Sequence, residues 1–325
     1  MSQESIPPPV FFDSQGWRRL LVNAASWTSL TVVGMLIAVL VTTAIQSPVM
    51  RGITLAEAPR SLSAQLNPAT SGANEPRIQA AQARTVSAWV SGRALRYGHV
   101  VTWDDKSFSS LRRNVQHLDV VIAEWLSLTD ARGRMTRVDP DYETSVVRWI
   151  SRNSPATQIY PHINNYDRDQ QRWAAEATAE MLGSKEARVQ FIDEVEAYMV
   201  DVGLPGLVLD FEQLPLTSRA HYVSLVSELG RRLRMHGKRF IVQVPVANAA
   251  YDYSGLAAAA DAVILMTYDE HVEVGAAGPI AGQGWFEAQL RDASRLIPKN
   301  KLIVSVGSYG YDWAGYGKGR EIAVA

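Results

Sequence analysis

From about residue 95 onward, apolar residues form short, near-continuous runs separated by stretches with helical spacing. Runs of this kind predict parallel strands that are buried on both faces. The stretches between them predict amphipathic helices, for example over 185–202, 218–236 and 285–296. The seven predicted strands are Tyr97–Trp103, Leu118–Trp125, Thr157–Asn164, Gly206–Glu212, Arg239–Val246, Ala262–Tyr268 and Lys301–Tyr309.

Strands that alternate with helices predict βαβ units and an α/β fold with a parallel sheet. Seven such units within about 230 residues predict a (β/α)₈ TIM barrel, which typically takes about 250 residues. A doubly wound sheet is the alternative, but no glycine-rich phosphate turn follows the first strand. We therefore expect a barrel over residues 93–325. Since the sequence stops at Ala325, either one strand is hidden or the eighth unit is missing and the barrel is C-terminally incomplete.

The region before the barrel has a different character. Leu20–Ile45 carries no charged side chain, and a helix needs about 20 apolar residues to cross a membrane. A cleavable signal peptide is the alternative, but its apolar region usually spans about 7–15 residues. Arg18 and Arg19 precede the segment, against Arg51 alone after it, which favours a cytoplasmic N-terminus. We expect a cytoplasmic leader over 1–19, a single transmembrane helix over 20–45 and a linker over 46–92.

Composition narrows the classes of function. Lys and Arg number 32 against 33 Asp and Glu, so no basic field is available to recruit nucleic acid. Cysteine is absent, which excludes disulfides and thiolate metal sites. None of the six histidines has a histidine partner four residues away, as a metal-dependent deacetylase would require. The 47% hydrophobic content is ample for a fold that rests on apolar burial.

Two carboxylates share one side of the predicted strand 206–212. Side chains alternate along a strand, so Asp210 and Glu212 lie on the same face as Val208. Buried carboxylates nearly always have a partner or a task, which makes the pair either a salt-bridged strand end or a catalytic site. Two further predicted strands end in polar and aromatic groups, at Tyr268-Asp269 and at Tyr309. Because barrel active sites lie at the carboxyl ends of the strands, the three ends together favour catalysis.

The segment Gly206-Leu207-Val208-Leu209-Asp210-Phe211-Glu212 resembles the fourth-strand signature of glycoside hydrolase family 18, Asp-Gly-x-Asp-x-Asp-x-Glu. The run Met266-Thr267-Tyr268-Asp269-Glu270-His271, with Gly278-Pro279-Ile280 and Tyr309–Trp313, is similar to the spore-germination branch of this chitinase-like family. That branch acts on cell-wall polymers that contain N-acetylglucosamine. Pro9–Asp13 and Trp103–Phe108 resemble large bacterial proteins that fuse such a barrel to a polysaccharide deacetylase and a family 2 glycosyltransferase.

The resemblance implies a glycoside hydrolase of the chitinase or N-acetylglucosaminidase type, without metal or organic cofactor, that cleaves β-linked N-acetylglucosamine polysaccharide. In the substrate-assisted retaining mechanism the substrate's acetamido oxygen attacks the anomeric carbon. Glu212 would protonate the leaving oxygen, Asp210 would accept the acetamido N–H, and Tyr268 would donate its hydroxyl to the acetamido oxygen. Further substrate contacts are expected from Trp103, Trp125, Asn164, Asn165, Gln243, Met266, Asp269 and Tyr309.

With the predicted span, the resemblance places the chain in a bacterial inner membrane, with its catalytic domain periplasmic or extracellular, and with a fused or associated deacetylase and glycosyltransferase as partners. The family's first two acidic positions are Pro205 and Val208 here, so Asp210 would have to ionise and reorient unaided. The alternative is a non-catalytic carbohydrate-binding barrel that supports polysaccharide synthesis, modification or export. His162 and His271 lie near predicted strand ends and either contact substrate or have a structural role.

Overall fold

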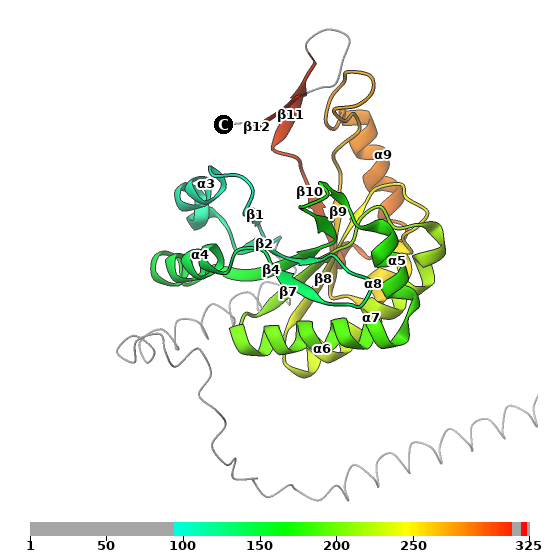
Figure 1. Cartoon of the computed structure of the whole chain (residues 1–325). Helices are drawn as coiled ribbons and strands as arrows, with labels where there is room; N and C mark the ends of the chain where they lie inside the picture. The colour runs from blue at the N-terminus through cyan, green and yellow to red at the C-terminus, as the bar shows by residue number, and fades with distance from the viewer. Residues whose placement is uncertain (1–93, 314–319, 324–325) are drawn as a thin grey trace, which may run out of the picture. The chain divides into compact units, whose positions relative to one another are not determined.

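The computed structural model describes residues 94–313 and 320–323. At its centre is a curved sheet of parallel strands in the order β1-β2-β4-β7-β8-β9-β10, with the short β3 antiparallel to β2 (Figure 1). The strands are β1 (Tyr97–Val101), β2 (Val120–Leu128), β3 (Met135–Arg137), β4 (Gln158–Asn164), β7 (Gly206–Asp210), β8 (Arg239–Pro245), β9 (Ala262–Met266) and β10 (Leu302–Ser305).

Helices follow most strands and surround the outer side of the sheet (Figure 1). They are α3 (Ser107–Asn114), α4 (Pro140–Asn153), α5 (Ala175–Gly183), α6 (Lys185–Val202), α7 (Arg219–Met235), α8 (Tyr253–Ala259) and α9 (Gln283–Ala293), with the 3₁₀ turns η2 (Val115–His117), η3 (Leu216–Ser218) and η4 (Lys299–Lys301). Two antiparallel hairpins complete the described part, β5 (Tyr166–Asp167) with β6 (Arg172–Trp173) and β11 (Tyr309–Asp312) with β12 (Arg320–Ala323).

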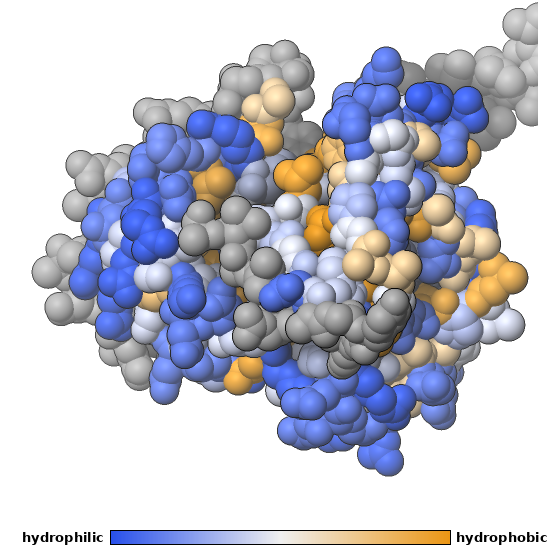
Figure 2. Space-filling view, turned by 90° about the horizontal axis from the view of Figure 1, so that it is seen from above, coloured by the Kyte–Doolittle hydropathy of each residue, from blue (hydrophilic) through white to orange (hydrophobic). Residues whose placement is uncertain are grey.

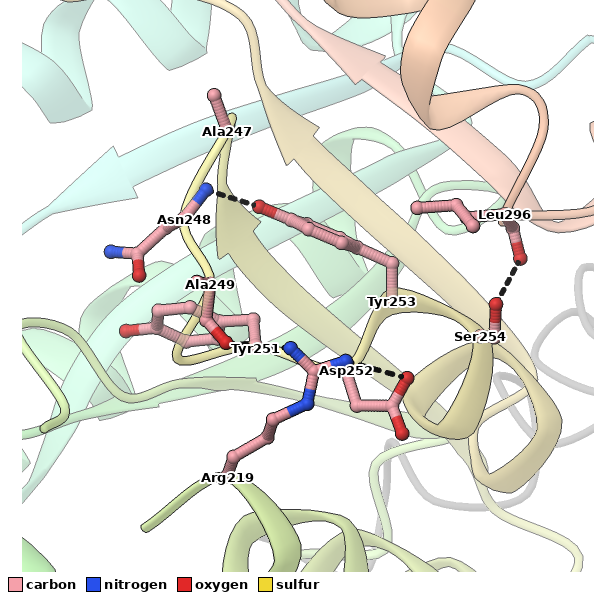
Figure 3. Close-up of a pocket in the computed structure, with 9 residues that line it drawn as sticks. All are labelled: Arg219, Ala247, Asn248, Ala249, Tyr251, Asp252, Tyr253, Ser254 and Leu296. Atoms are coloured by element: carbon pink, nitrogen blue, oxygen red, sulfur yellow. Dashed lines mark hydrogen bonds and ion pairs between the residues drawn. The ribbon is translucent and has the colours of Figure 1, made fainter. Parts of the chain in front are cut away.

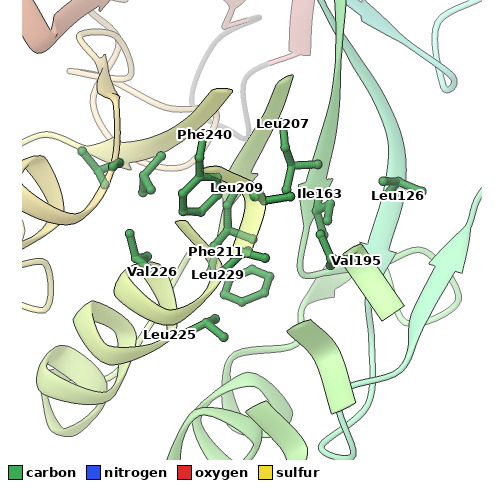
Figure 4. Close-up of a cluster of buried hydrophobic side chains, with 14 of the residues drawn as sticks. Leu126, Ile163, Val195, Leu207, Leu209, Phe211, Leu225, Val226, Leu229 and Phe240 are labelled. Atoms are coloured by element: carbon green, nitrogen blue, oxygen red, sulfur yellow. The ribbon is translucent and has the colours of Figure 1, made fainter. Parts of the chain in front are cut away.

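The sheet is apolar on both faces, because its side chains alternate between two separate clusters. On the outer face, Leu207, Leu209 and Phe211 pack with the helices, including Leu225 and Leu229 of α7 (Figure 4). On the inner face lies a smaller cluster, composed of Val120, Ile122, Tyr160, Val208, Ile241, Ala262 and Ile264. The near-continuous apolar runs of the sequence follow from this double burial.

Gly206 allows the backbone of β7 to lie close to the inner cluster. A Cβ atom added at this residue would lie 2.5 Å from the ring of Tyr160, which is too close for any real contact. The glycine therefore lets the Tyr160 ring lie directly against the first residue of the strand that carries the two carboxylates.

The seven predicted strands are all present, and most end earlier than the sequence suggested. β7 ends at Asp210 rather than Glu212, and β10 ends at Ser305. Tyr309, which was expected to end the seventh strand, instead begins β11 of the second hairpin. The polar and aromatic residues predicted at these strand ends therefore lie in loops. This is the usual position of site residues in a barrel, where the active site is formed by the loops that follow the carboxyl ends of the strands.

Within the described residues, β1 and β10 each pair with one neighbouring parallel strand, and neither pairs with the other. The parallel sheet with its surrounding helices is consistent with a (β/α)₈ barrel that is open between β1 and β10. The predicted leader 1–19, transmembrane helix 20–45 and linker 46–92 lie outside the described residues. Over 94–313 and 320–323, no helix is both long enough and apolar enough to cross a membrane.

Candidate active site

The two carboxylates of the 206–212 segment lie at the carboxyl end of β7. Asp210 is the last residue of the strand and is buried, with 2% of its surface exposed. Glu212 follows two residues later, and its backbone is held from both sides by the Asn165 side chain. The Glu212 N–H donates to Asn165 Oδ1 at 2.8 Å, while Asn165 Nδ2 donates to the Glu212 carbonyl at 3.0 Å. This pair of bonds fixes the direction in which Glu212 leaves the strand.

Asp210 is surrounded by polar groups of the neighbouring strands. Its Oδ2 atom accepts a hydrogen bond from Gln243 Nε2 at 2.7 Å and lies 3.2 Å from His162 Nε2. Its Oδ1 atom is buried and has no hydrogen-bond partner within the described part of the chain. Burial and the nearby charge of Glu124 raise the pKa of Asp210 well above its usual value, and the Gln243 bond only partly offsets them. These effects favour the protonated form of Asp210, whose Oδ1 atom is a free acceptor.

Glu212 is half-buried and also holds a proton. Burial, followed by the charges of Asp210, Asp269 and Glu124, raises the pKa of Glu212 to about 9. None of the hydrogen bonds or ion pairs found over 94–313 involves its side-chain oxygens. A carboxylic acid that is protonated at neutral pH and not bound to a neighbour has the properties of a general acid.

Tyr268, Asp269 and Tyr309 form the side of the site that follows β9. The ring centroids of Tyr268 and Tyr309 are 6.0 Å apart, and the Tyr309 hydroxyl donates to Asp269 Oδ1 at 2.5 Å. Asp269 adopts a left-handed backbone with φ of 65°, which is costly for a residue other than glycine and turns the chain sharply after the strand. Burial, Asp210 and Glu212 raise the pKa of Tyr268, so its phenol keeps the hydrogen that it could donate.

Other residues predicted as substrate contacts have different positions. Asn164 ends β4 and pairs in register with Asp210, and its Nδ2 atom donates to Glu124. Gln243 and Met266 are both buried beside Asp210, with 3.4 Å between Gln243 Nε2 and Met266 Sδ. These three residues therefore line the bottom of the site, where they support the carboxylates.

Two of the residues predicted as substrate contacts are buried away from solvent. Trp125 is fully buried on the outer side of the sheet, where its Nε1 atom donates to the Tyr198 hydroxyl. Its side chain shares the outer face with Val121 and Ala123, as the alternation along β2 requires, and the bulge between Glu124 and Leu126 places Leu126 on that face as well. Asn165 is also fully buried, and its amide is used by Thr178 and by the backbone of Glu212. Trp103, by contrast, is 60% exposed on the loop after β1.

The set of predicted site residues omitted Glu124 and left the role of His162 open. Glu124 points to the inner side of β2, where it accepts hydrogen bonds from Asn164 Nδ2 and from Arg168 Nη2 at 3.1 and 3.2 Å. Its charge acts on both Asp210 and Glu212. The alternation with Ile122 along β2 was the signal that could have placed Glu124 on the inner face.

A cavity of about 330 Å³ lies beside the loop between β8 and α8 (Figure 3). Its lining includes Asn248, whose N–H donates to the Tyr253 hydroxyl, and Asp252, which pairs with Arg219 at 3.4 Å. Asp210, Glu212 and Tyr268 are not among its lining residues. The cavity is therefore separate from the carboxylate site. Over 94–313 and 320–323, no group of three or more histidine, aspartate or glutamate side chains could hold a metal ion.

The surface above the sheet differs from the sides of the molecule. Seen from above in Figure 2, weakly polar and apolar residues show near the middle, hydrophilic residues dominate the left side, and the right side is mixed.

Comparisons with known proteins found a matching family, two similar glycosylases and a similar chitinase structure. Residues 87–322 match the sequence model described as Glycosyl hydrolases family 18. The chain is 25% identical over 237 residues to the "Uncharacterized glycosylase YvbX" of Bacillus subtilis (strain 168), covering 69% of this chain and 67% of that protein. It is 26% identical over 148 residues to the "Putative sporulation-specific glycosylase YdhD" of the same organism, covering 43% of this chain and 35% of that protein. Among solved structures, a chitinase from Chromobacterium violaceum ATCC 12472 superposes with a TM-score of 0.65 at 25% identity, covering 71% of this chain and 74% of that one.

Proposed function

Because this chain belongs to the glycosyl hydrolases of family 18, we propose that it cleaves β-linked N-acetylglucosamine polysaccharide by substrate-assisted retaining catalysis. The observation that carries the proposal is Glu212. Its carboxyl group is protonated at neutral pH and is not bound to any group of the described chain, two residues from a second buried carboxyl group. The similar proteins named as a chitinase and as glycosylases support a substrate of this class.

The reaction would begin at the scissile oxygen. Glu212 donates its proton to that oxygen, which becomes the leaving group, while the substrate's acetamido oxygen attacks the anomeric carbon. Asp210 Oδ1 is a free buried acceptor for the acetamido N–H, and the Tyr268 hydroxyl is a donor for the acetamido oxygen. These two contacts hold the acetamido group in the orientation that attack requires. Glu212, now a carboxylate, then removes a proton from the water that opens the cyclic intermediate.

The test is the release of reducing ends by the full chain from N-acetylglucosamine oligomers and from peptidoglycan. We expect turnover, with the β-anomer formed first, because the acetamido attack and the water attack each invert the anomeric carbon. Formation of the α-anomer first would contradict the mechanism. No turnover on either substrate would contradict the function itself.

Val208 favours the second candidate, a non-catalytic carbohydrate-binding barrel. It is fully buried in the inner cluster, at the position where the family signature has an acidic residue. If Asp210 cannot change its charge without an acidic neighbour, the site would bind acetamido sugars and not cleave them. Oligosaccharide binding measured by calorimetry, together with no release of reducing ends, would support this candidate.

For the N-terminal region, we propose that 20–45 anchors the chain in a bacterial inner membrane, with the barrel on the outer side. The support is its length without a charged residue and the Arg18-Arg19 pair before it. We expect the full chain to stay in the membrane fraction after alkaline carbonate extraction, and the barrel to be digested by protease added outside spheroplasts. Release of the chain by carbonate, or protection from protease, would contradict this arrangement.

A further inference from the structure

His162 is a buried histidine that contacts one of the two carboxylates directly. It lies on β4, where its backbone pairs in register with Val208 of β7, and only 3% of its surface is exposed. Its Nε2 atom is 3.2 Å from Asp210 Oδ2. Its Nδ1 atom is buried without a hydrogen-bond partner in the described part of the chain. The imidazole ring therefore occupies the inner side of the barrel at the level of Val208, next to Asp210.

The hydrogen bonds around Asp210 indicate which atom carries its proton. Oδ2 accepts the Gln243 N–H at 2.7 Å, and an amide nitrogen cannot serve as an acceptor in return. If the proton of Asp210 is on Oδ2, that oxygen accepts from Gln243 and donates to His162 Nε2, and both contacts are satisfied. Oδ1 then remains the carbonyl oxygen of the acid, free to accept the acetamido N–H of a substrate.

Charged and titratable groups from three strands face His162. These are His99 on β1, at 5.8 Å between ring centroids, Glu124 on β2, and Asp210 on β7. Burial lowers the pKa of His162 and favours the neutral ring, whereas the charge of Glu124 acts in the opposite direction. Glu124 is itself held by Arg168 and Asn164. A positive charge on His162 would therefore face two carboxylates, Glu124 and Asp210, which stabilise it against the cost of burial.

We propose that His162 is the positioning residue that exchanges a proton with Asp210 during turnover. As positive charge develops on the acetamido group, the proton leaves Asp210 Oδ2 for the lone pair of His162 Nε2, which produces a carboxylate beside the substrate and an imidazolium behind it. The proton returns when the positive charge disappears, so the pair neither gains nor loses a proton over a cycle. This inference rests on the proposed function. In it, His162 is the neighbour that shares a proton with Asp210, a role that the apolar side chain of Val208 cannot fill.

The first test compares His162→Gln with the wild type, using the full chain. Glutamine can accept a hydrogen bond at the position of Nε2, but it cannot take up a proton. We expect kcat to fall at least about 10-fold with little change in KM, and the remaining activity to rise with pH, since Asp210 must then lose its proton to solvent. His236→Gln is the matched control, because His236 is exposed at the end of α7, where it pairs with Glu196. Unchanged kcat and pH profile in His162→Gln would overturn the inference.

The second test needs no variant to fold. ¹⁵N-histidine labelling of the wild-type chain reports which ring nitrogen of His162 carries hydrogen. We expect hydrogen on Nδ1 and a hydrogen-bond acceptor at Nε2 near neutral pH. Hydrogen on Nε2 would overturn the inference, since that nitrogen could not take the proton of Asp210. An inactive wild type would remove the proposed function and the turnover step with it, whereas an active wild type with either contrary result would remove the proton exchange alone.

Discussion

Replacing Glu212 by glutamine is expected to lower kcat at least about 1000-fold and to leave the affinity for oligosaccharides nearly unchanged. Glutamine has the shape of the protonated acid and cannot give up a proton to the leaving oxygen. The backbone of residue 212 is held by Asn165 and not by its own side chain, so the variant should keep the local structure. Reducing-end release gives kcat, and calorimetry with N-acetylglucosamine oligomers gives the affinity.

Glu180→Gln is the matched control for this substitution. Glu180 is exposed on α5, so the same chemical change at that residue should leave both kcat and affinity as in the wild type. If Glu212→Gln kept more than about a tenth of the wild-type kcat, Glu212 would not be the general acid, because a lost general acid typically costs at least about 100-fold.

The sequence was sufficient to predict the seven parallel strands of the sheet, since their signals are local. Helix α6 has the predicted limits, because Ser184 caps its first turn and Gly203 ends it in a left-handed conformation with φ of 68°. The common face of Val208 and Asp210 was also predicted correctly, because side chains alternate along β7. What was predicted correctly depends on spacing within one element.

The parts that could not be predicted depend on contacts between distant segments. The bulge that places Leu126 on the same face as Trp125 is defined by the pairing of β2 with β4, which the residues of β2 alone do not show. Asn165 is 47 residues from Glu212, and His162 is 48 residues from Asp210. A polar residue at a strand end is expected in a barrel site, but its task depends on which neighbour it meets. Sequence alone therefore could not distinguish a substrate contact from a support of the carboxylates.

The same Glu212→Gln substitution is expected to stabilise the protein above neutral pH. A carboxyl group with a pKa of about 9 in the folded state and about 4.3 in the unfolded state binds its proton more tightly when folded. Between these two values the unfolded chain releases the proton and the folded chain keeps it, so this group makes the free energy of unfolding fall as pH rises. Glutamine does not titrate, and its advantage over Glu212 should therefore increase with pH.

At pH 8 we expect Glu212→Gln to unfold at least about 2–4 °C higher than the wild type, which corresponds to about 1 kcal/mol for a domain of this size. Below about pH 3.5 the difference should vanish, since the wild-type carboxyl group is then protonated in both states. Thermal unfolding of the full chain across this range, with Glu180→Gln as the control, measures the effect. A difference that is constant with pH would show that the gain comes from packing, and a wild type more stable at pH 8 would show that Glu212 is ionised when folded. Either result would remove the protonated acid on which the proposed hydrolysis depends, because the burial that destabilises the Glu212 carboxylate is also what keeps its proton available for the substrate.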